Sequence, residues 1–450
     1  MAKIFPFSGI IYNKKTAGNL SKVMIPPYDV ISPDDQAKFY DVHPYNCIRL
    51  TLGKTFQGDT DLNNKYTRSA AFFNSWLKNG VLAQDDEESI YAYEQRFKYK
   101  GKNLTRLGFI ALFKLEELEA GRVYPHENTL VKPKQDRLDL LKATSANFEP
   151  IFSLFIDEEE KIARNLKKNI KRKPLIEVRD NMGMQNRLWK ITSRSAINKL
   201  IKEMANKQLY IADGHHRYEA ALKYRNEMRS RSQKATGDEP YNFIMMYFTN
   251  IYDKGLVILP IHRLVMALNL KEKINLENRL VDYFDTEEIK FGKNTELAAR
   301  KKLIRQMSKT VEGQHNFGMY LHGENKYWLL KLKNERLIDK YVSSDKPREL
   351  KKLDVTILHS IVIREILGIS DRDIELENSV RFVHNDDEAF DLVKQGGYQL
   401  AFFLNPTKVE QVVSVADKYE KMPQKSTFFY PKLLTGLVMY RMPNKEKFSF

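Results

Sequence analysis

The sequence is poor in cysteine and has no long apolar segment. Cys47 is the single cysteine among 450 residues, so no disulfide framework can form within the chain, and we expect a reducing, cytoplasmic setting. No run of about 18 apolar residues occurs, which argues against a transmembrane helix and a membrane partner. The N-terminal residues lack the features of a signal peptide. We also find no repeat, no low-complexity segment, no Walker-type glycine-rich loop and no paired-cysteine spacing for a metal.

The composition is typical of a soluble globular protein. Hydrophobic residues make up 42% and charged residues 29% of the sequence, which excludes a disordered chain. A length of 450 residues is sufficient for two or three domains with substantial cores. Short strand-like and helical patterns alternate along the chain, which indicates a mixed α/β (α+β) fold.

The formal net charge of +16 comes from 74 basic and 58 acidic residues, and much of this excess is local. Seven of the thirteen positions from Lys161 to Lys173 are Lys or Arg, directly after four acidic residues at 157–160. Acidic residues at the start and basic residues at the end are typical of an exposed helix whose dipole is compensated. This pattern favours a solvated helix over a nucleic-acid surface, so we do not expect a nucleic-acid partner.

One short stretch has the pattern of a phosphate site. The apolar run Leu209–Ala212 predicts a buried strand, Asp213 and Gly214 interrupt it, and small or apolar residues at helical spacing begin after His215. The first turn of such a helix presents backbone N–H groups at the positive end of a dipole, which favours phosphate or carboxylate. Arg217 would add a planar guanidinium that can bind oxygens in a bidentate way.

Two other interpretations of this stretch stay open. It could be a structural corner in which the histidines cap the helix or face solvent. His215 and Glu219 also have the i, i+4 spacing of helix-borne metal ligands, which leaves a metal site as a minor alternative.

Further candidate groups lie upstream. Asp29 stands between the rigid Pro26-Pro27 and a helix start at Ser32, where either a ligand-binding carboxylate or a turn-forming aspartate would fit. The segment Tyr124–Arg137 is dense in polar residues and contains two prolines, so we expect an ordered loop that carries functional groups.

Downstream, the apolar segments 243–248 and 255–264 are expected to complete the sheet of the first domain. A hairpin is predicted over 317–332, a helix over 353–367, and a small α/β domain after residue 266. The closing segment 426–432 is aromatic, with Lys425, Ser426, Thr427 and Lys432 as potential donors to phosphate or carboxylate; a tail docked by its aromatic residues is the alternative.

The five residues Asp213-Gly214-His215-His216-Arg217 resemble the phosphate-binding signature of the ParB/sulfiredoxin superfamily. Its free-serine kinases use an Asp-Gly-His-His-Arg form, which this sequence matches at all five positions. Sulfiredoxins need a cysteine where this chain has His215, and ParB-type proteins carry a DNA-binding helix-turn-helix that we do not find. Nearly the whole chain also resembles a large bacterial family, domain-of-unknown-function family 1015. The motifs that carry this second resemblance are Pro26–Ser32, Pro125–Glu127, Pro133–Leu138, Ala146–Phe152, the Asp213 signature, Leu259–Arg263 and Lys425–Lys432.

The superfamily resemblance implies a phosphotransferase that makes O-phosphoserine from free L-serine, with ATP and magnesium, or ADP, as the donor. The donor phosphates would be bound by Gly214, His215, His216, Arg217 and Lys134. Asp213 would bind the magnesium or orient a histidine, and His216 would take part in catalysis.

Residues outside the signature are assigned to this reaction by their position and chemistry, without a motif match. Glu127 would accept the proton of the serine hydroxyl, and Asp29, Asp136 and Arg137 would bind serine. A non-catalytic nucleotide- or phosphoester-binding regulatory protein and a ParB-like DNA-associated protein are the alternatives. We expect a ParB/sulfiredoxin-like nucleotide-binding domain over 1–265 and a smaller α/β domain over 266–450. A homodimer is left open.

Overall fold

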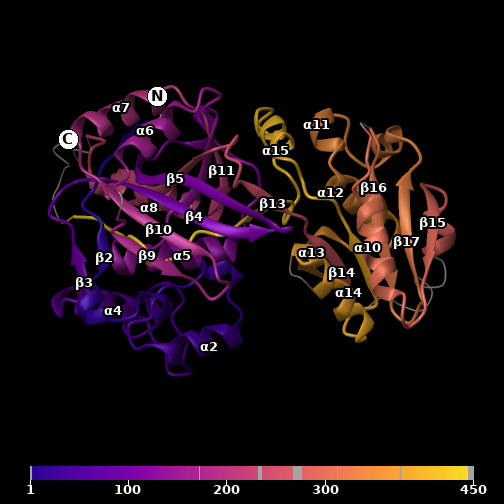
Figure 1. The fold of residues 1–450 in the computed structure, drawn as a ribbon, viewed down its shortest axis with the longest axis horizontal. Helices are drawn as coiled ribbons and strands as arrows, with labels where there is room; N and C mark the ends of the chain where they lie inside the picture. The colour runs from indigo at the N-terminus through magenta and orange to yellow at the C-terminus, as the bar shows by residue number, and fades with distance from the viewer. Residues whose placement is uncertain are drawn as a thin grey trace. The chain divides into compact units, whose positions relative to one another are not determined.

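The computed structural model describes residues 3–171, 173–231, 236–266, 276–311, 313–375 and 378–443. The chain forms two compact units, which are coloured along the sequence in Figure 1. The first unit contains the chain up to Pro125, residues Thr129–Val257 and the segment from Pro431 onward; the second contains His126–Asn128 and Ile258–Tyr430. The expected mixed α/β fold is confirmed. The domain division at residue 265 stays a prediction.

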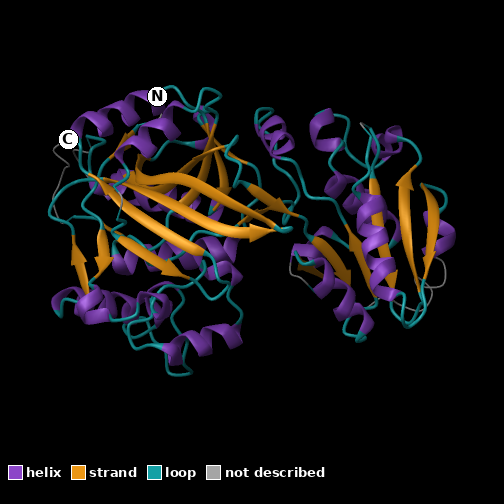
Figure 2. Ribbon diagram, in the orientation of Figure 1, coloured by secondary structure: helices purple, strands orange, loops and turns teal. Residues whose placement is uncertain are grey.

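The first unit is built on a nine-stranded sheet. Eight strands follow the order β6-β11-β8-β12-β5-β4-β10-β9, and the short β1 pairs with β5. β11 runs parallel to β6 and β12 parallel to β8, and the other neighbours are antiparallel. Figure 2 shows the long strands crossing the middle of this unit with helices around them. The strands are β1 (Ile4–Phe5), β4 (Ile90–Tyr99), β5 (Lys102–Lys114), β6 (Val123–Pro125), β8 (Ile151–Phe155), β9 (Ile176–Arg179), β10 (Gln185–Ile191), β11 (Leu209–Asp213) and β12 (Phe243–Asn250).

Local sequence explains several of these elements. The β4–β5 hairpin turns at Lys100 and Gly101, with φ angles of 46° and 79°, as a two-residue turn with both residues left-handed requires. Helix α2 begins after Ser32, whose hydroxyl accepts a hydrogen bond from the Asp35 amide at 3.2 Å. The main helices of the unit are α2 (Pro33–Val42), α4 (Lys65–Lys78), α5 (Val131–Thr144), α6 (Lys161–Asn169), α7 (Arg194–Met204) and α8 (His215–Arg231).

The C-terminal segment of the first unit lies against the centre of the sheet. Arg106 on β5 is fully buried, and its guanidinium donates hydrogen bonds to the Gln95 side chain and to the Pro431 carbonyl. Gln95 also donates to the Lys432 carbonyl at 2.9 Å, and the Leu434 amide donates to the Tyr93 hydroxyl at 3.2 Å. These bonds fix the backbone on both sides of Lys432.

The second unit contains a six-stranded antiparallel sheet in the order β15-β17-β16-β19-β14-β18. Figure 1 shows α10 (Glu296–Met307) lying across β16 and β17, where Leu303 and Met307 join the core with Phe390 and Phe403. The predicted hairpin over 317–332 is confirmed as β16 and β17. The helix predicted over 353–367 forms as a short α-helix, Asp354–Ile357, that continues as a π-helix over Leu358–Ile366. The strands are β14 (His262–Val265), β15 (Phe284–Lys290), β16 (Asn316–Leu321), β17 (Lys326–Leu332), β18 (Val380–Val383) and β19 (Leu400–Phe403).

Two sequence-based expectations about this fold are wrong. Residues 255–264 do not complete the first sheet: they divide at Pro260 into β13 (Val257–Leu259), which pairs with β20 (Phe428–Tyr430), and β14, which joins the second sheet. The expected loop 124–137 ends at Leu130, because α5 begins at Val131. Pro133 is tolerated in the first turn of α5, where backbone N–H groups have no intrahelical acceptor. Among the described residues, no helix combines the length and the apolar character that crossing a membrane requires.

We expect the substitution Gly108→Ala to destabilise the first unit. A Cβ at Gly108 would overlap the Phe248 carbonyl oxygen and lie 2.5 Å from the Tyr247 ring, both on the neighbouring strand β12. The free energy of unfolding should fall by about 1–3 kcal/mol, the usual range for overpacking. Calorimetry would measure this, with Gly58→Ala as the control, since no described atom lies within 4 Å of a Cβ there. Equal Tm values for the two variants would contradict the packing argument.

Candidate functional site

The expected strand–turn–helix corner is present in the first unit. β11 ends at Asp213 and α8 begins at His215, so the chain turns at Gly214 alone. Gly214 has a φ of 93°, and a Cβ there would lie 2.9 Å from the guanidinium of Arg217. A glycine is therefore required both by the backbone and by the close approach of Arg217. The first turn of α8 directs its N–H groups toward this corner.

Two cations bind the carboxylate of Asp213. Lys432 donates to Oδ1 at 2.7 Å, and Arg217 donates to Oδ2 at 3.2 Å. All three side chains are largely buried, with 11–15% of their surface exposed. The corner thus combines a helix N-terminus with an ionised carboxylate and two cationic groups, which is a chemistry suited to phosphate and to a phosphate-bound cation.

Arg217 also connects the corner to Glu149. Its guanidinium donates to the Pro150 carbonyl at 2.7 Å and lies 3.1 Å from Oε2 of Glu149. The Arg217–Glu149 contact has the distance of an ion pair but not the orientation of a hydrogen bond. Neither Glu149 oxygen accepts a hydrogen bond from any residue that the structure describes.

Burial raises the pKa of Glu149 above its ordinary value. The charges of Arg217 and Arg137 oppose this shift without cancelling it, and those of Asp29 and Asp213 reinforce it. A buried carboxyl group with a raised pKa beside two arginines is a candidate for proton transfer.

Asp136 and Arg137, the proposed serine-binding pair, are bound to each other on α5. Arg137 donates to Asp136 through Nε at 3.0 Å and to the Thr51 carbonyl at 2.9 Å, and its guanidinium lies 3.9 Å from the centre of the Tyr28 ring. A cavity of about 50 Å³ borders Arg137, Glu149 and Arg217. The pair therefore lies beside the corner, but its charges are largely neutralised within the protein.

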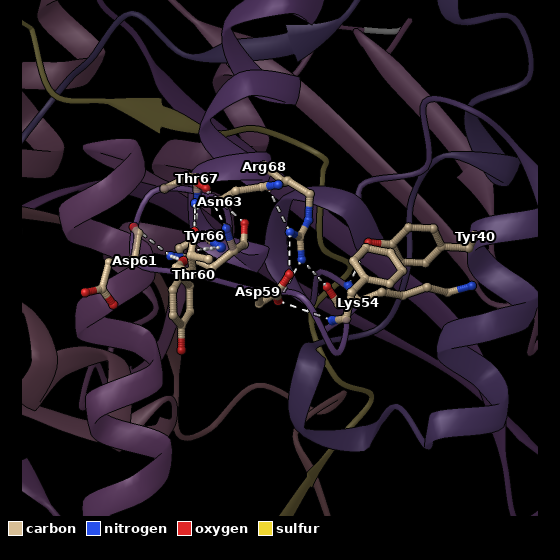
Figure 3. A network of polar contacts seen from close by, with 11 residues as sticks. Tyr40, Lys54, Asp59, Thr60, Asp61, Asn63, Tyr66, Thr67 and Arg68 are labelled. Atoms are coloured by element: carbon tan, nitrogen blue, oxygen red, sulfur yellow. Dashed lines mark hydrogen bonds and ion pairs between the residues drawn. The ribbon is translucent and has the colours of Figure 1, made fainter.

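Helix α4 holds Asp136 from the other side. Lys65 and Tyr66 both donate to its Oδ1, the tyrosine hydroxyl at 2.8 Å. The start of α4 is fixed by the polar network in Figure 3, in which Arg68 binds both oxygens of Asp59 at 2.7 and 2.9 Å and the Lys54 carbonyl at 2.8 Å. The loop before α4 thereby sets the positions of the groups that reach Asp136.

His216 and Lys134 anchor the start of α5 to α8. The Leu130 amide donates to Nε2 of His216 at 2.9 Å, so that nitrogen acts as an acceptor. Lys134 donates to Glu219 at 3.0 Å, and the Thr129 hydroxyl donates to the same oxygen at 2.7 Å. Both proposed phosphate-binding side chains thus lie beside the first two turns of α8, but each already makes a contact within the protein. His215 is buried in the same turn.

Asp29 and Glu127 differ in where the fold places them. Asp29 is exposed in the first unit, and its charge contributes to the raised pKa values of Glu149 and Arg217. Glu127 belongs to the second unit, where its Oε1 accepts from the amides of Ser426 and Thr427 at 3.2 and 3.3 Å. Its proposed role as the base stays a prediction.

Magnesium would have to be held by few protein ligands. Among the described residues, no three His, Cys, Asp or Glu side chains come together in a way that could hold a metal ion. Mg²⁺ bound to a nucleotide commonly uses one or two carboxylates and takes its other ligands from phosphates and water. Asp213 fits this limited role, provided that a cationic partner gives up one carboxylate oxygen.

Sequence reasoning did not assign a role to Glu149 and treated Lys432 as one of several donors in an aromatic tail. Both lie in motifs that carry the family resemblance, within 146–152 and 425–432. The burial of Glu149 and the approach of Lys432 to Asp213, 219 positions earlier, depend on the folded chain.

The fold and the corner define a mixed α/β protein with a buried cluster of acids and bases at a strand–helix junction. The family model described as "Protein of unknown function (DUF1015)" matches residues 4–356, so the chain belongs to this family. No curated protein matches the chain.

Several solved structures are similar to the chain at low identity. A conserved hypothetical protein from Pyrococcus furiosus is 12% identical, with 71% of this chain and 91% of that chain covered and a TM-score of 0.34. A free serine kinase variant in complex with ADP is 11% identical, with 70% and 86% covered and a TM-score of 0.34. SbnI with a C-terminal truncation, from Staphylococcus aureus, is 12% identical, with 72% and 85% covered and a TM-score of 0.32.

Asp136 should stabilise the fold at neutral pH. Burial alone raises its pKa, but the charge of Arg137 and hydrogen bonds from Lys65 and Arg137 outweigh burial and lower the pKa from 3.8 to about 2. The contribution is therefore present above pH 3.8 and is lost as the pH falls toward 2. We expect Asp136→Asn to lower the free energy of unfolding at pH 7 by about 2 kcal/mol, with a smaller difference at pH 3. Urea denaturation at both pH values measures this, with Asp139→Asn on the same helix as the control. A loss independent of pH would contradict it.

Glu149 should change the pH dependence of stability in the opposite direction. Because its folded pKa is raised, the protonated form is favoured in the native state, and stability is lost as the pH rises above the unfolded value of 4.5. We therefore expect the stability of Glu149→Gln, relative to the parent protein, to increase between pH 4.5 and pH 8. Thermal unfolding across this range tests the sign, with exposed Glu158→Gln as the control. A relative stability that decreases with pH would show that the Arg217 ion pair outweighs burial.

Proposed function

We propose that the protein is a phosphotransferase that moves a phosphoryl group from ATP or ADP to the hydroxyl of free L-serine. The observation that carries this proposal is the Asp213 carboxylate, held between Lys432 and Arg217 at the N-terminus of α8. Phosphoryl transfer needs fixed cations and backbone N–H groups around the phosphates, and little covalent chemistry from the protein. The corner supplies such groups in a largely buried setting.

In this proposal the donor phosphates lie against Gly214, His215, His216 and Arg217. Lys432 joins this set because its ammonium is already at the corner, and Lys134 would join it by leaving Glu219. Mg²⁺, when bound, would neutralise phosphate charge, and Asp213 would supply a carboxylate oxygen to it. His216 holds the Leu130 amide and so keeps the start of α5 beside the phosphates.

Serine would be bound by groups at the edge of the same corner. Arg137 would attract its carboxylate, and Asp29 and Asp136 its ammonium. Glu127 remains the proposed base for the serine hydroxyl. Glu149 is a second candidate for this role, because its pKa is raised and its oxygens accept no hydrogen bond in the described structure.

The proposal is tested by incubating the protein with Mg-ATP or Mg-ADP and a panel of free amino acids, and detecting phosphorylated products by mass spectrometry. We expect phosphoserine, and we expect Lys432→Ala to lower kcat/KM by about 100- to 1,000-fold, since it removes a preorganised cation. Lys223→Ala on α8 is the matched control: Lys223 contacts the exposed side chain of Gln135, and its loss should leave activity close to that of the parent.

Glu127→Gln and Glu149→Gln separate the two candidate bases. Replacing the residue that acts as the base should strongly lower kcat, whereas replacing the other glutamate should leave most of kcat unchanged. Activity that survives in both variants would retain the reaction and discard both residues. If no amino acid is phosphorylated with either nucleotide, the kinase proposal fails; a nucleotide-induced rise in Tm would then favour a regulatory nucleotide-binding protein.

A further inference from the structure

A large hollow of the first unit lies away from the corner. It has a volume of about 570 Å³, is open to solvent on one side, and is lined by helix α6 and by strands β4, β5, β8, β10 and β12. Small-molecule sites usually measure about 300–1,000 Å³. In the described structure, Asp213, Arg217 and Lys432 are not among its lining residues. We refer to this space as the α6 cavity.

The inner wall of the α6 cavity is apolar and partly aromatic. Trp189 on β10, Phe248 on β12 and Phe155 on β8 come from the sheet, and Ile162 and Leu166 come from α6. All five residues are buried. Flat aromatic walls of this kind favour a ligand with an apolar, planar body.

The indole N–H of Trp189 is a polar group of this wall without a hydrogen-bond acceptor in the described structure. Nε1 of Trp189 is buried and finds no hydrogen-bond acceptor in the described part of the chain, although the residue is only 4% exposed. An indole N–H can only donate, and leaving such a donor unpaired is unfavourable. An acceptor atom on a bound molecule would satisfy it once the side chains that cover it shift slightly.

The outer rim of the α6 cavity is positively charged. Lys167 and Lys171 at the end of α6, Lys254 after β12 and Arg96 on β4 are exposed lining residues. Arg187 is the fifth basic residue of the lining, and its guanidinium lies 5.1 Å from the centre of the Trp189 ring. The rim would therefore attract a negatively charged group.

The acidic residues of the lining do not cancel this charge at the rim. Glu94 accepts hydrogen bonds from Arg187 at 3.0 Å and from Arg96 at 2.8 Å, so its negative charge is neutralised by these two arginines. Asp253 accepts from the amides of Gly255 at 2.8 Å and Leu107 at 3.2 Å, and burial raises its pKa. Glu160 is the third acid of the lining. It precedes the first residue of α6, whereas Lys167 and Lys171 lie at the other end of this helix.

We propose that the α6 cavity is a binding site for a small organic anion with an aromatic body. The body would pack beside Trp189 against the partly exposed Leu107, Ala163 and Ile170 of the lining. The anionic group would meet Lys167, Lys171 and Lys254. This site is independent of the proposed phosphate site at the corner.

The test uses 8-anilinonaphthalene-1-sulfonate, a fluorescent aromatic anion, with the full-length protein. We expect saturable binding at one site and energy transfer from Trp189, which Trp189→Phe should reduce. The double variant Lys167→Ala/Lys171→Ala should bind about tenfold more weakly. Lys168→Ala is the matched control, because Lys168 lies on the same helix and is not a lining residue in the described structure.

Competition with indole-3-acetate and neutral indole separates the charge from the aromatic body. The acetate should displace the probe at lower concentration than indole, and inorganic phosphate alone should not displace it. Ala163→Phe, which fills the cavity from α6, should abolish binding while the Tm shows that the variant is folded. The proposal is overturned if binding is not saturable, if the Lys167/Lys171 variant binds like the Lys168 variant, or if folded Ala163→Phe still binds the probe.

Discussion

The geometry of the corner depends on a buried positive charge in the middle of the sheet. Arg106 is fully buried, and burying such a charge is costly unless the guanidinium is paired or hydrogen-bonded. It lies 4.6 Å from the centre of the Phe152 ring and donates to the carbonyl of Pro431. The next residue, Lys432, reaches Asp213. The position of a cation at the candidate site is thus determined by a strand that contributes no group to that site.

Burial and charge give two neighbouring acids opposite properties. Asp136 is bonded directly by Arg137, and this contact together with Lys65 outweighs the cost of burial and lowers its pKa. Glu149 is buried and receives no hydrogen bond from the residues that the structure describes, so burial dominates and raises its pKa. The same region can therefore keep one carboxylate ionised at neutral pH and favour a proton on another, which is the pairing that acid–base chemistry needs.

The sequence predicts the corner well because all of its determinants are local. An apolar run, a glycine and a helical pattern within a few residues specify strand, turn and helix, and the structure follows them at 209–231. Strand partners are not local: the segment 255–264 has the apolar pattern of a strand, but this pattern does not show which sheet it joins, and His262–Val265 pairs in the second sheet. The start of a helix is also hard to predict where a residue type fits two structures. Proline is common in loops and in the first turn of a helix, and Pro133 lies in the first turn of α5. The raised pKa of Glu149 requires burial, which no local pattern determines.

The basic residues near α6 show why net charge does not identify a partner. In the sequence they form one dense cluster, and a solvated helix and a nucleic-acid surface are both consistent with it. In the fold, Ile162 and Leu166 pack against the sheet, and Lys167 and Lys171 stand at the mouth of a cavity with an aromatic wall. A nucleic-acid backbone needs cations that follow it over a long surface, whereas cations at the mouth of a small cavity act on one compact ligand. The arrangement of the charges, more than their number, therefore favours a small anion.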